Sequence, residues 1–354
     1  MNIHQILAGY ADGDAISSEA ILLREVFRRW GHGSEIYVSP DRVSPSLKGD
    51  CRPLAEYSAR PADLCLHHYG IASPAVEVFL ASPARKIMIY HNITPAEYFT
   101  GFDNEVAAQL RAARGALREV ARRADAVWTV SRFNAAELKA EGVEGVKVFP
   151  LLFSPQPPGL APDPLIIEKF AGPMHNILFV GRLVPNKRVE DLIQAFAWYH
   201  MTLDPFSRLI VVGSQQSAAR YFSMLKMLMG DLDLTTVCFA GFASDADLAA
   251  YYRIAHLYVS ASAHEGYCRP LLEAMDHGIP VIARAAGGTP EAMQDAGVLY
   301  EDLPPQELAA LMHRVLTDAS LRGEVLRSQA ERIRRERERP VEAELKALLA
   351  GLVA

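Results

Sequence analysis

The chain has 354 residues, 50% of them hydrophobic and 22% charged, which is enough for about two domains with apolar cores of their own. Its 42 acidic and 36 basic residues leave a net charge of -6, and this argues against nucleic acid as a partner, because phosphate-backbone binding requires a basic excess. The four cysteines lack metal-ligand spacing, so we expect reduced thiols. The apolar runs are far shorter than the ~18 residues of a membrane span, and the start lacks a signal-peptide pattern. We therefore expect a cytoplasmic protein.

Short β-rich runs alternate along the whole chain with longer stretches of helical periodicity, which predicts an α/β protein with parallel sheets covered by helices. The first long stretch has apolar residues at three- and four-residue steps from Ala20 to Trp30. We expect a helix there, capped by Ser17 or Ser18 and ended by Gly31. The strands expected in this half are residues 35–38, 63–67, 86–91, 125–130 and 146–149.

A proline-rich segment divides the chain. Six of the fifteen residues from 150 to 164 are proline, which holds the backbone extended. We expect a first domain at residues 1–155, a linker at 156–172 and a second domain at 173–338. Both are Rossmann-like and bind ligands at the carboxyl ends of their strands, so a site in a cleft between them is expected. The strands of the second domain are residues 176–180, 208–212, 237–240, 257–260 and 280–283.

The chain ends in a charged run and an apolar stripe. Residues 331–339 carry five arginines against three glutamates, a mixture typical of a solvated helix face. After Pro340, the apolar residues at positions 341, 345, 348, 349 and 352 share one face of a helix. We expect this last helix, within residues 339–354, to pack on another part of the protein, and the first domain is the candidate.

The densest cluster of candidate functional residues follows the fourth strand of the second half. A glycine-containing turn leads there into a helix that has Pro270 in its first turn. Free amide groups from Cys268 to Leu271, together with the positive end of the helix, are suited to bind an anion such as a diphosphate. Glu265 and Glu273 flank this anion site. Taken alone, the same two glutamates also fit a helix cap and a surface position.

Two cations and an aromatic residue are expected at the same edge of the second sheet. Arg182 and Lys187 follow its first strand, where they could grip phosphate oxygens and stabilise charge on a departing diphosphate. Phe242 follows Gly241 at the end of another strand, where backbone groups could face a nucleobase. Each feature taken alone also fits an ordinary surface cation or a plain turn.

The first half offers fewer candidates. Gly13 lies between the first strand and its helix, where the absence of a Cβ lets a ligand approach the backbone closely. His91 ends the strand at residues 86–91, so its ring is expected to face the cleft and could hydrogen-bond a sugar hydroxyl. His91 is therefore a catalytic candidate, with a purely structural role as the alternative. His67 and His68 are adjacent in a strand and point to opposite faces, so they are poor joint metal ligands.

No metal site is expected. Three Asp-x-Asp pairs, at residues 12–14, 231–233 and 245–247, have a spacing that can hold a divalent cation, and their scatter through an acidic chain indicates chance. The chain also lacks Gly-x-Gly-x-x-Gly, the phosphate loop with Gly-Lys-Ser/Thr, and His-Glu-x-x-His. The usual signatures of nicotinamide-binding, kinase-like and zinc-protease proteins are therefore excluded.

Together, these motifs resemble glycosyltransferase family 4, and the likeness covers nearly the whole chain. It rests on Gly181-Arg182 with Lys187, Val237-x-Phe239-x-Gly241, Glu265-Gly266-Tyr267 with Glu273-Ala274-Met275, Gly278-x-Pro280-Val281, and Gly287-Gly288-x-Pro290-Glu291. The resemblance implies the GT-B fold, a nucleotide-diphosphate sugar as donor, no metal or other cofactor, and retention of anomeric configuration. By this likeness Arg182 and Lys187 hold the diphosphate. Glu273 accepts the ribose hydroxyls, and Glu265 contacts the donor sugar.

The first half is similar to a narrower group, the mannosyltransferase-like enzymes of bacterial O-antigen and exopolysaccharide assembly. The matching stretches are residues 13–16, 67–70, 90–99 and 130–134. This likeness favours mannose as the sugar and a saccharide or lipid-linked acceptor, and it adds Asp14 to the substrate-binding candidates. The chain departs from the broader family where Gly13-Asp14 replaces a paired-glycine loop and Cys268-Arg269 replaces the usual small residue. The remaining donor-binding candidates are Tyr267, Cys268, Arg269 and Leu271.

The sequence therefore predicts a retaining hexosyltransferase. Two alternatives stay open, a noncatalytic scaffold that binds a nucleotide sugar and a nucleotide-sugar epimerase. The donor base, the sugar, the acceptor and the linkage also stay open. A basic stripe on one expected helix suits either contact with anionic lipid headgroups or a solvated face paired with acids. It consists of Arg111, Arg114, Arg118 and Arg122.

Overall fold

The structure is a computed structural model that describes residues 1–153 and 159–352. The chain divides into two compact units. Unit 1 comprises residues 1–97, 104–152 and 340–354, and unit 2 comprises residues 98–103 and 153–339. Part of the linker expected at 156–172, residues 156–158, lies outside the described residues. The rest differs from the expectation, because Pro164–Phe170 forms the helix α5 of unit 2, with the Asp163 side chain accepting from the amides of its first turn.

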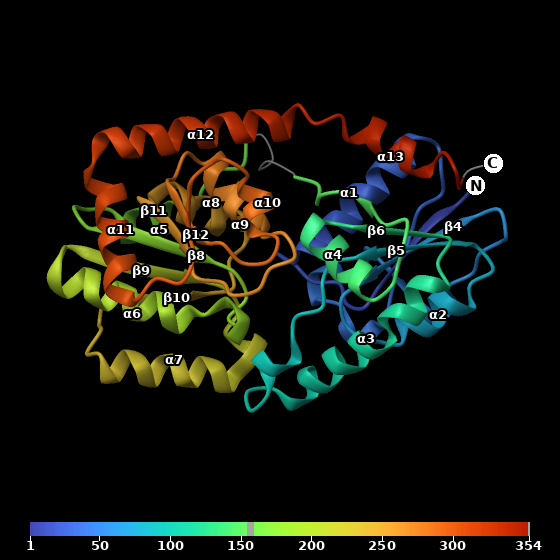
Figure 1. Cartoon of the computed structure of the whole chain (residues 1–354), viewed down its shortest axis with the longest axis horizontal. Coiled ribbons are helices and arrows are strands. Elements are labelled where there is room, and N and C mark those ends of the chain that lie inside the picture. Colours follow the sequence, from blue (N-terminus) through green and yellow to red (C-terminus); the bar gives the residue numbers. More distant parts are fainter. Residues whose placement is uncertain (154–158, 353–354) are drawn as a thin grey trace. The chain divides into compact units, whose positions relative to one another are not determined.

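Unit 1 is built on a seven-stranded sheet in the order β3-β2-β1-β4-β5-β6-β7, with every pair of neighbours parallel. Figure 1 labels β4, β5 and β6 of this sheet. The strands are β1 (Ile3–Leu7), β2 (Ile36–Val38), β3 (Arg52–Pro53), β4 (Leu64–Tyr69), β5 (Arg85–Tyr90), β6 (Ala126–Thr129) and β7 (Lys147–Val148). The helices are α1 (Ala15–Arg29), α2 (Ala75–Ala81), α3 (Asn104–Arg122), α4 (Arg132–Ala140) and α13 (Val341–Leu349).

Unit 2 is built on a six-stranded parallel sheet in the order β10-β9-β8-β11-β12-β13. The strands are β8 (His175–Val180), β9 (Ser207–Val212), β10 (Val237–Gly241), β11 (Leu257–Ser260), β12 (Val281–Arg284) and β13 (Val298–Tyr300). Besides α5, its helices are α6 (Val189–Thr202), α7 (Ala219–Asp231), α8 (Asp245–Ile254), α9 (Arg269–Asp276), α10 (Thr289–Met293), α11 (Pro305–Thr317) and α12 (Ala319–Arg337).

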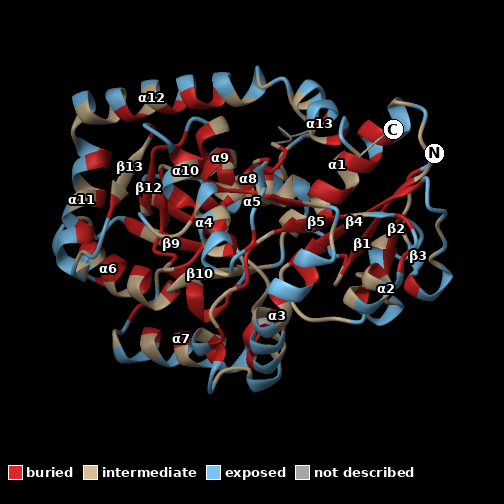
Figure 2. Ribbon diagram, turned by 45° about the vertical axis from the view of Figure 1, so that its right-hand side comes forward, coloured by how far each residue is buried: buried red, intermediate tan, exposed pale blue. Residues whose placement is uncertain are grey.

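The central strands of the two sheets are buried because helices cover them, as the parallel pattern predicts, whereas the edge strands β3 and β7 are exposed. All residues of β4 are buried, and Figure 2 shows buried strands beside helices that turn one exposed face to solvent. The expected strands lie within one or two residues of those observed. The expected ranges did not include β1, although a first strand before Gly13 was inferred. They also did not include the short strands β3 and β13, since two or three residues carry little periodicity.

The first helix begins earlier than the sequence pattern indicates. Asp14 is its cap, because one carboxylate oxygen accepts from both the amide and the hydroxyl of Ser17, at 2.9 and 3.0 Å. The prediction of Ser17 or Ser18 as the cap is therefore wrong. At the other end, the amide of Gly31 donates to Arg28 O.

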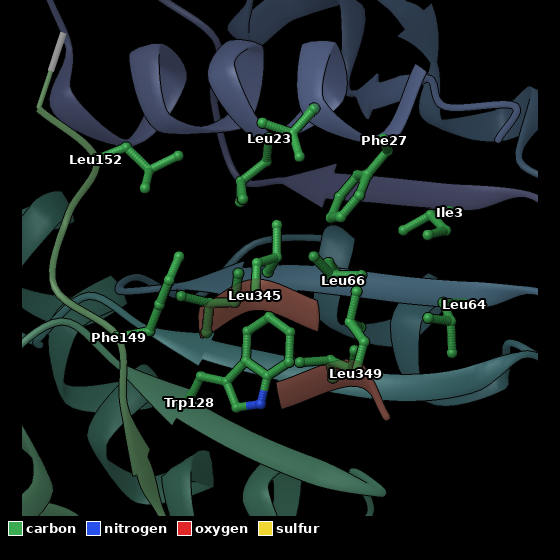
Figure 3. Close-up of a cluster of buried hydrophobic side chains, with 13 residues drawn as sticks. Ile3, Leu23, Phe27, Leu64, Leu66, Trp128, Phe149, Leu152, Leu345 and Leu349 are labelled. Atoms are coloured by element: carbon green, nitrogen blue, oxygen red, sulfur yellow. The ribbon is translucent and has the colours of Figure 1, made fainter. Parts of the chain in front are cut away.

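The last helix packs within unit 1. Leu345 and Leu349 of α13 are buried in a cluster with Phe27, Leu66 and Trp128 (Figure 3). Fully burying two leucine side chains is worth about 3–6 kcal/mol in apolar area removed from water. The indole Nε1 of Trp30 also donates to Glu342 at 3.0 Å. Residues 353 and 354 of the segment expected to dock lie outside the described part of the chain.

The charged run before α13 is not wholly solvated. Arg332 and Glu336 are buried on the inner face of α12 and form an ion pair at 2.7 Å. The prediction of a solvated helix face is therefore wrong for these two residues.

Among the described residues, no helix is long and apolar enough to span a membrane.

Candidate functional site

The loop after β8 carries the two predicted cations of unit 2. Arg182 follows Gly181 directly at the carboxyl end of this strand, and its side chain is exposed. It forms no ion pair with any residue that the structure describes. Lys187 ends the short turn Pro185–Lys187, and its side chain is mostly buried. One cation is thus available to an anionic ligand, and the other is held in the protein.

Lys187 is held by Glu265, as the structure brings these two predicted residues together. The Lys187 Nζ lies 2.5 Å from Oε1 of Glu265, and both side chains are largely shielded from solvent. Burial opposes ionisation of Glu265, but attraction to the Lys187 ammonium outweighs it, so the pKa of Glu265 lies below its ordinary value of 4.5. At neutral pH the pair therefore presents a fixed carboxylate beside a fixed ammonium.

Two hydrogen bonds tie the loops that carry this pair. The side-chain amide of Asn186 donates to His264 O at 3.0 Å, and the backbone amide of Ala263 donates to Asn186 O at 2.9 Å. The loop after β8 and the loop after β11 are therefore fixed to each other within unit 2. Such bonds limit how far Lys187 and Glu265 can separate.

Gly287 and Gly288, the glycine pair of the sequence motif, lie against the backbone of the loop that carries Glu265. A Cβ on Gly287 would lie 2.3 Å from Glu265 O, and one on Gly288 would lie 2.1 Å from Gly266 O. The amide of Gly288 also donates to Glu265 O at 2.8 Å. Because any side chain would collide with this backbone, both positions require glycine, and the Glu265 backbone is held in place by their close approach.

The start of α9 offers fewer free amides than expected. Cys268 precedes the helix at a φ of 75°, in the left-handed region that residues with a Cβ rarely adopt. Pro270 has no N–H, and the amide of Leu271 donates to Cys268 O at 3.3 Å. The expectation of free amides throughout Cys268 to Leu271 is therefore wrong in part. Burial raises the pKa of the Cys268 thiol well above its ordinary value, so the thiol is neutral.

Both carboxylate oxygens of Glu273 have partners. Arg269 Nε lies 2.7 Å from Oε1, and the hydroxyl of Tyr252 on α8 donates to Oε2 at 2.9 Å. These contacts orient the carboxylate that the motif assigns to ribose. A ligand hydroxyl at Glu273 must therefore share the carboxylate with Arg269 or displace it.

Arg332 is a residue that the sequence analysis missed. Tyr267 is buried, and its hydroxyl accepts from Arg332 Nη2 at 3.3 Å. The Arg332 Nε donates to Ala292 O at 2.9 Å, so one guanidinium links α12, α10 and the Glu265 loop. The hydrogen bond from Arg332 fixes Tyr267 to α12, and the role of Tyr267 in substrate binding stays a prediction.

The end of β10 is open to solvent, in keeping with a ligand-facing role. Phe242 is 59% exposed and follows Gly241, whose φ is 79°. Nearby, a Cβ on Gly213 would lie 1.9 Å from Gly181 O, so the ends of β8 and β9 are packed without side chains between them. The exposed ring of Phe242 offers a flat apolar surface at this edge.

In unit 1, Gly13 and Asp14 have separate tasks. Gly13 is exposed with a φ of 69°, which suits a tight turn open to a ligand. The Asp14 carboxylate is engaged as the cap of α1, so it is oriented by the helix rather than free to rotate.

The side chain of His91 is only 3% exposed, which differs from the expectation of a ring facing a cleft. Its Nε2 lies 2.8 Å from Nδ1 of His68 and 3.5 Å from a carboxylate oxygen of Glu19. Burial lowers the pKa of His91 to about 3. His67 points to the other face of β4, where its Nδ1 bonds Ile6 O, as strand alternation predicts.

Comparison with known proteins shows which family part of the chain resembles. Residues 168–335 match the family model described as Glycosyl transferases group 1. This match covers a little less than half of the chain, and it is the part of the chain that resembles the family. The serotype-specific mannosyltransferase WbdA of Escherichia coli is 27% identical over 159 residues, which are 45% of this chain and 19% of WbdA. The chain thus spans only a small part of the length of this relative.

Solved structures with a similar fold cover nearly the whole chain. Sucrose-phosphate synthase from Thermosynechococcus elongatus has a TM-score of 0.77 at 20% identity, with 99% of both chains covered. Alr3699/HepE of Anabaena, in complex with UDP-glucose, has a TM-score of 0.73 at 20% identity, again with 99% of both chains covered. The GT-B fold with two Rossmann-like units, expected from the motifs, is confirmed.

Proposed function

We propose that this protein is a retaining glycosyltransferase that moves a hexose from a nucleotide-diphosphate sugar to a saccharide or lipid-linked acceptor in cell-surface polysaccharide synthesis. The observation that carries this proposal is the buried Lys187–Glu265 pair beside the exposed Arg182, on two bonded loops within the residues that match the group 1 family model. A cation open to solvent next to a fixed ammonium and carboxylate suits a ligand that joins a diphosphate to a sugar.

In this proposal each residue has one task. Arg182 grips the phosphate oxygens, and Lys187 stabilises the charge that develops as the diphosphate departs. Glu265 contacts the donor sugar, and Glu273 accepts the ribose hydroxyls. The bond from the anomeric carbon to the phosphate oxygen breaks while an acceptor oxygen bonds to the same face of that carbon. The acceptor proton passes to the departing diphosphate, so no covalent glycosyl intermediate is formed.

Mannose is the favoured sugar, carried by GDP or UDP, because the similar WbdA is a mannosyltransferase. The solved complex of HepE with UDP-glucose supports a nucleotide sugar as the ligand class. We propose that transfer needs no metal at the donor diphosphate, since Arg182 and Lys187 supply the positive charge there. The rate should then be unchanged by added Mg²⁺ or Mn²⁺.

Two variants test the assigned roles against matched controls. Glu265→Gln and Arg182→Ala should each lower turnover of donor plus acceptor about 10²–10³-fold, the cost of removing one fixed stabilising group from a transition state. The exposed Glu168→Gln and Arg253→Ala should stay near the wild-type rate. Undiminished product formation by the first two, with folded protein by circular dichroism, would refute the roles.

The identity of donor and product needs a separate experiment. Thermal shifts against UDP-, GDP- and ADP-sugars identify the donor, and NMR of the product identifies the reaction. A new glycosidic bond with the donor's anomeric configuration supports the proposal. Conversion of donor alone into an isomer would identify an epimerase, and binding without any turnover would identify a scaffold.

A cytoplasmic location with peripheral contact to the inner face of the membrane belongs to the same proposal. Arg111, Arg118 and Arg122 are exposed on α3, which supports contact with anionic headgroups. Arg114 is less available for such contact, because it pairs with Glu137 and donates to Ile93 O at 2.7 Å.

A further inference from the structure

Three side chains that can bind a metal meet inside unit 1. Glu19 comes from α1, His68 from β4, and His91 follows the end of β5. One potential ligand atom from each lies within 4.8 Å of the others, and the three side chains are at most 3% exposed. Two imidazoles and one carboxylate form a donor set that first-row transition metals, zinc among them, accept.

The hydrogen bonds around His68 leave its inner nitrogen as an acceptor. The side-chain amide of Gln5 donates to Ala20 O at 2.8 Å, so Oε1 is the atom of Gln5 that accepts. That oxygen lies 2.9 Å from Nε2 of His68, which must therefore carry the proton. The lone pair of His68 Nδ1 then accepts a hydrogen bond from Nε2 of His91, and a bound metal ion would replace this hydrogen bond, with the His91 proton on Nδ1. A partner such as Gln5 is what fixes the tautomer of a metal-binding histidine.

The spacing of the three groups suits one ion. Two ligands about 2.0–2.1 Å from zinc at a tetrahedral angle are about 3.3–3.4 Å apart. The separations here are 2.8 Å from His68 Nδ1 to His91 Nε2 and 3.5 Å from His91 Nε2 to Glu19. A shift of a few tenths of an ångström would bring these atoms to zinc-binding distances.

We propose that Glu19, His68 and His91 bind one Zn²⁺ ion, with a water molecule as the fourth ligand. Burial keeps both imidazoles neutral, which is the form that binds metal. The ion would join the first helix, the central strand and the loop that begins at His91, so its role is to hold unit 1 together. The inference does not depend on the proposed function, because every residue in it belongs to unit 1.

The experiment measures metal in the intact chain. Protein purified without added chelator should contain about one zinc per chain by mass spectrometry of the elements. Removal of zinc with dipicolinate should lower the melting temperature, and Zn²⁺ should restore it. Cobalt substituted for zinc should give the visible absorption of tetrahedral Co²⁺. Protein that lacks zinc as purified and takes up neither ion would overturn the proposal.

Variants distinguish this site from adventitious binding. Glu19→Gln and His68→Gln should each weaken zinc binding at least 100-fold, and Gln5→Leu should weaken it about 10- to 100-fold through the lost support of His68. His67→Gln is the matched control, because this buried neighbour points to the opposite face of β4, and it should keep its zinc. Equal zinc content in the His68 and His67 variants would contradict the site. Should a variant fail to fold, the metal content and chelation of the wild-type protein still decide the question.

Discussion

Replacing Lys187 by methionine should destabilise unit 2 strongly, because it leaves Glu265 buried without its counter-ion. The ammonium lies 2.5 Å from the carboxylate, and the Glu265 side chain is only 9% exposed. Removing one partner of a buried ion pair costs about 3–5 kcal/mol. At about 2–4 °C per kcal/mol for a unit of this size, the melting temperature should fall by roughly 6–20 °C.

The loss should also depend on pH in a defined direction. In the wild type the pKa of Glu265 is below its ordinary value of 4.5, so the pair stabilises the fold above that pH, and the gain is lost as pH falls through the lowered pKa. In Lys187→Met the attraction to the ammonium is gone, so burial dominates and raises the pKa of Glu265. The variant then loses stability as pH rises from 4.5 through the raised pKa, so its deficit should be larger at pH 7.5 than at pH 5.

A double variant separates two contributions to the free energy of unfolding, namely the cost of burying the Glu265 carboxylate alone and the stabilisation by the Lys187–Glu265 ion pair. Lys187→Met with Glu265→Gln removes both charges, and it should recover most of the stability that Lys187→Met loses. The assay is urea unfolding followed by circular dichroism at the two pH values. A double variant as unstable as the single one, or a deficit that does not grow with pH, would refute the reasoning.

Three further substitutions have outcomes that the structure predicts. Gly288→Ala should cost about 3 kcal/mol or more in urea unfolding, since its Cβ would meet Gly266 O at 2.1 Å. Gly230→Ala, where no atom lies within 4 Å, should be neutral or slightly stabilising, and equal effects would contradict the steric argument. Leu349→Ala should cost about 2–5 kcal/mol, more than the partly buried Leu348→Ala, whereas equal costs would mean that α13 is not anchored by its inner face. Changing Arg111, Arg118 and Arg122 together to glutamine should weaken binding to anionic vesicles about 150-fold, at about 1 kcal/mol per arginine. Unchanged vesicle binding would exclude the stripe as the contact.

The features that were predicted best from the sequence are the strands and helices that depend on residues close together in the chain. The strands of both sheets follow from short apolar runs, and the stripe from Val341 to Leu352 identified a helix with one buried face. Helix starts were less accurate. Asp14 and Ser17 both suit a cap, and the choice between them depends on backbone angles that composition does not specify.

Contacts between distant residues were predicted only in part. The motif order placed Lys187 and Glu265 in one site, but not their direct pairing across 78 positions. The cluster of Glu19, His68 and His91 was missed because strand alternation says which faces residues share, and not which helix covers a face.

Arg332 shows how residue type and helical phase can disagree. Val325, Gln329, Arg332, Ile333 and Glu336 share one face of α12, with the same spacing as the buried stripe of α13. The position of Arg332 and Glu336 on this face of the helix therefore predicts that they are buried, whereas their charges predict that they are exposed. The polar side chains on this face are buried because backbone groups packed against α12 need hydrogen-bond partners. Gln329 bonds Val281 N and Ile279 O, and Arg332 bonds Ala292 O. A polar residue at a core-facing helix position is thus a signal that the helix satisfies neighbouring backbone groups, and here Arg332 also bonds Tyr267 in the loop that carries Glu265.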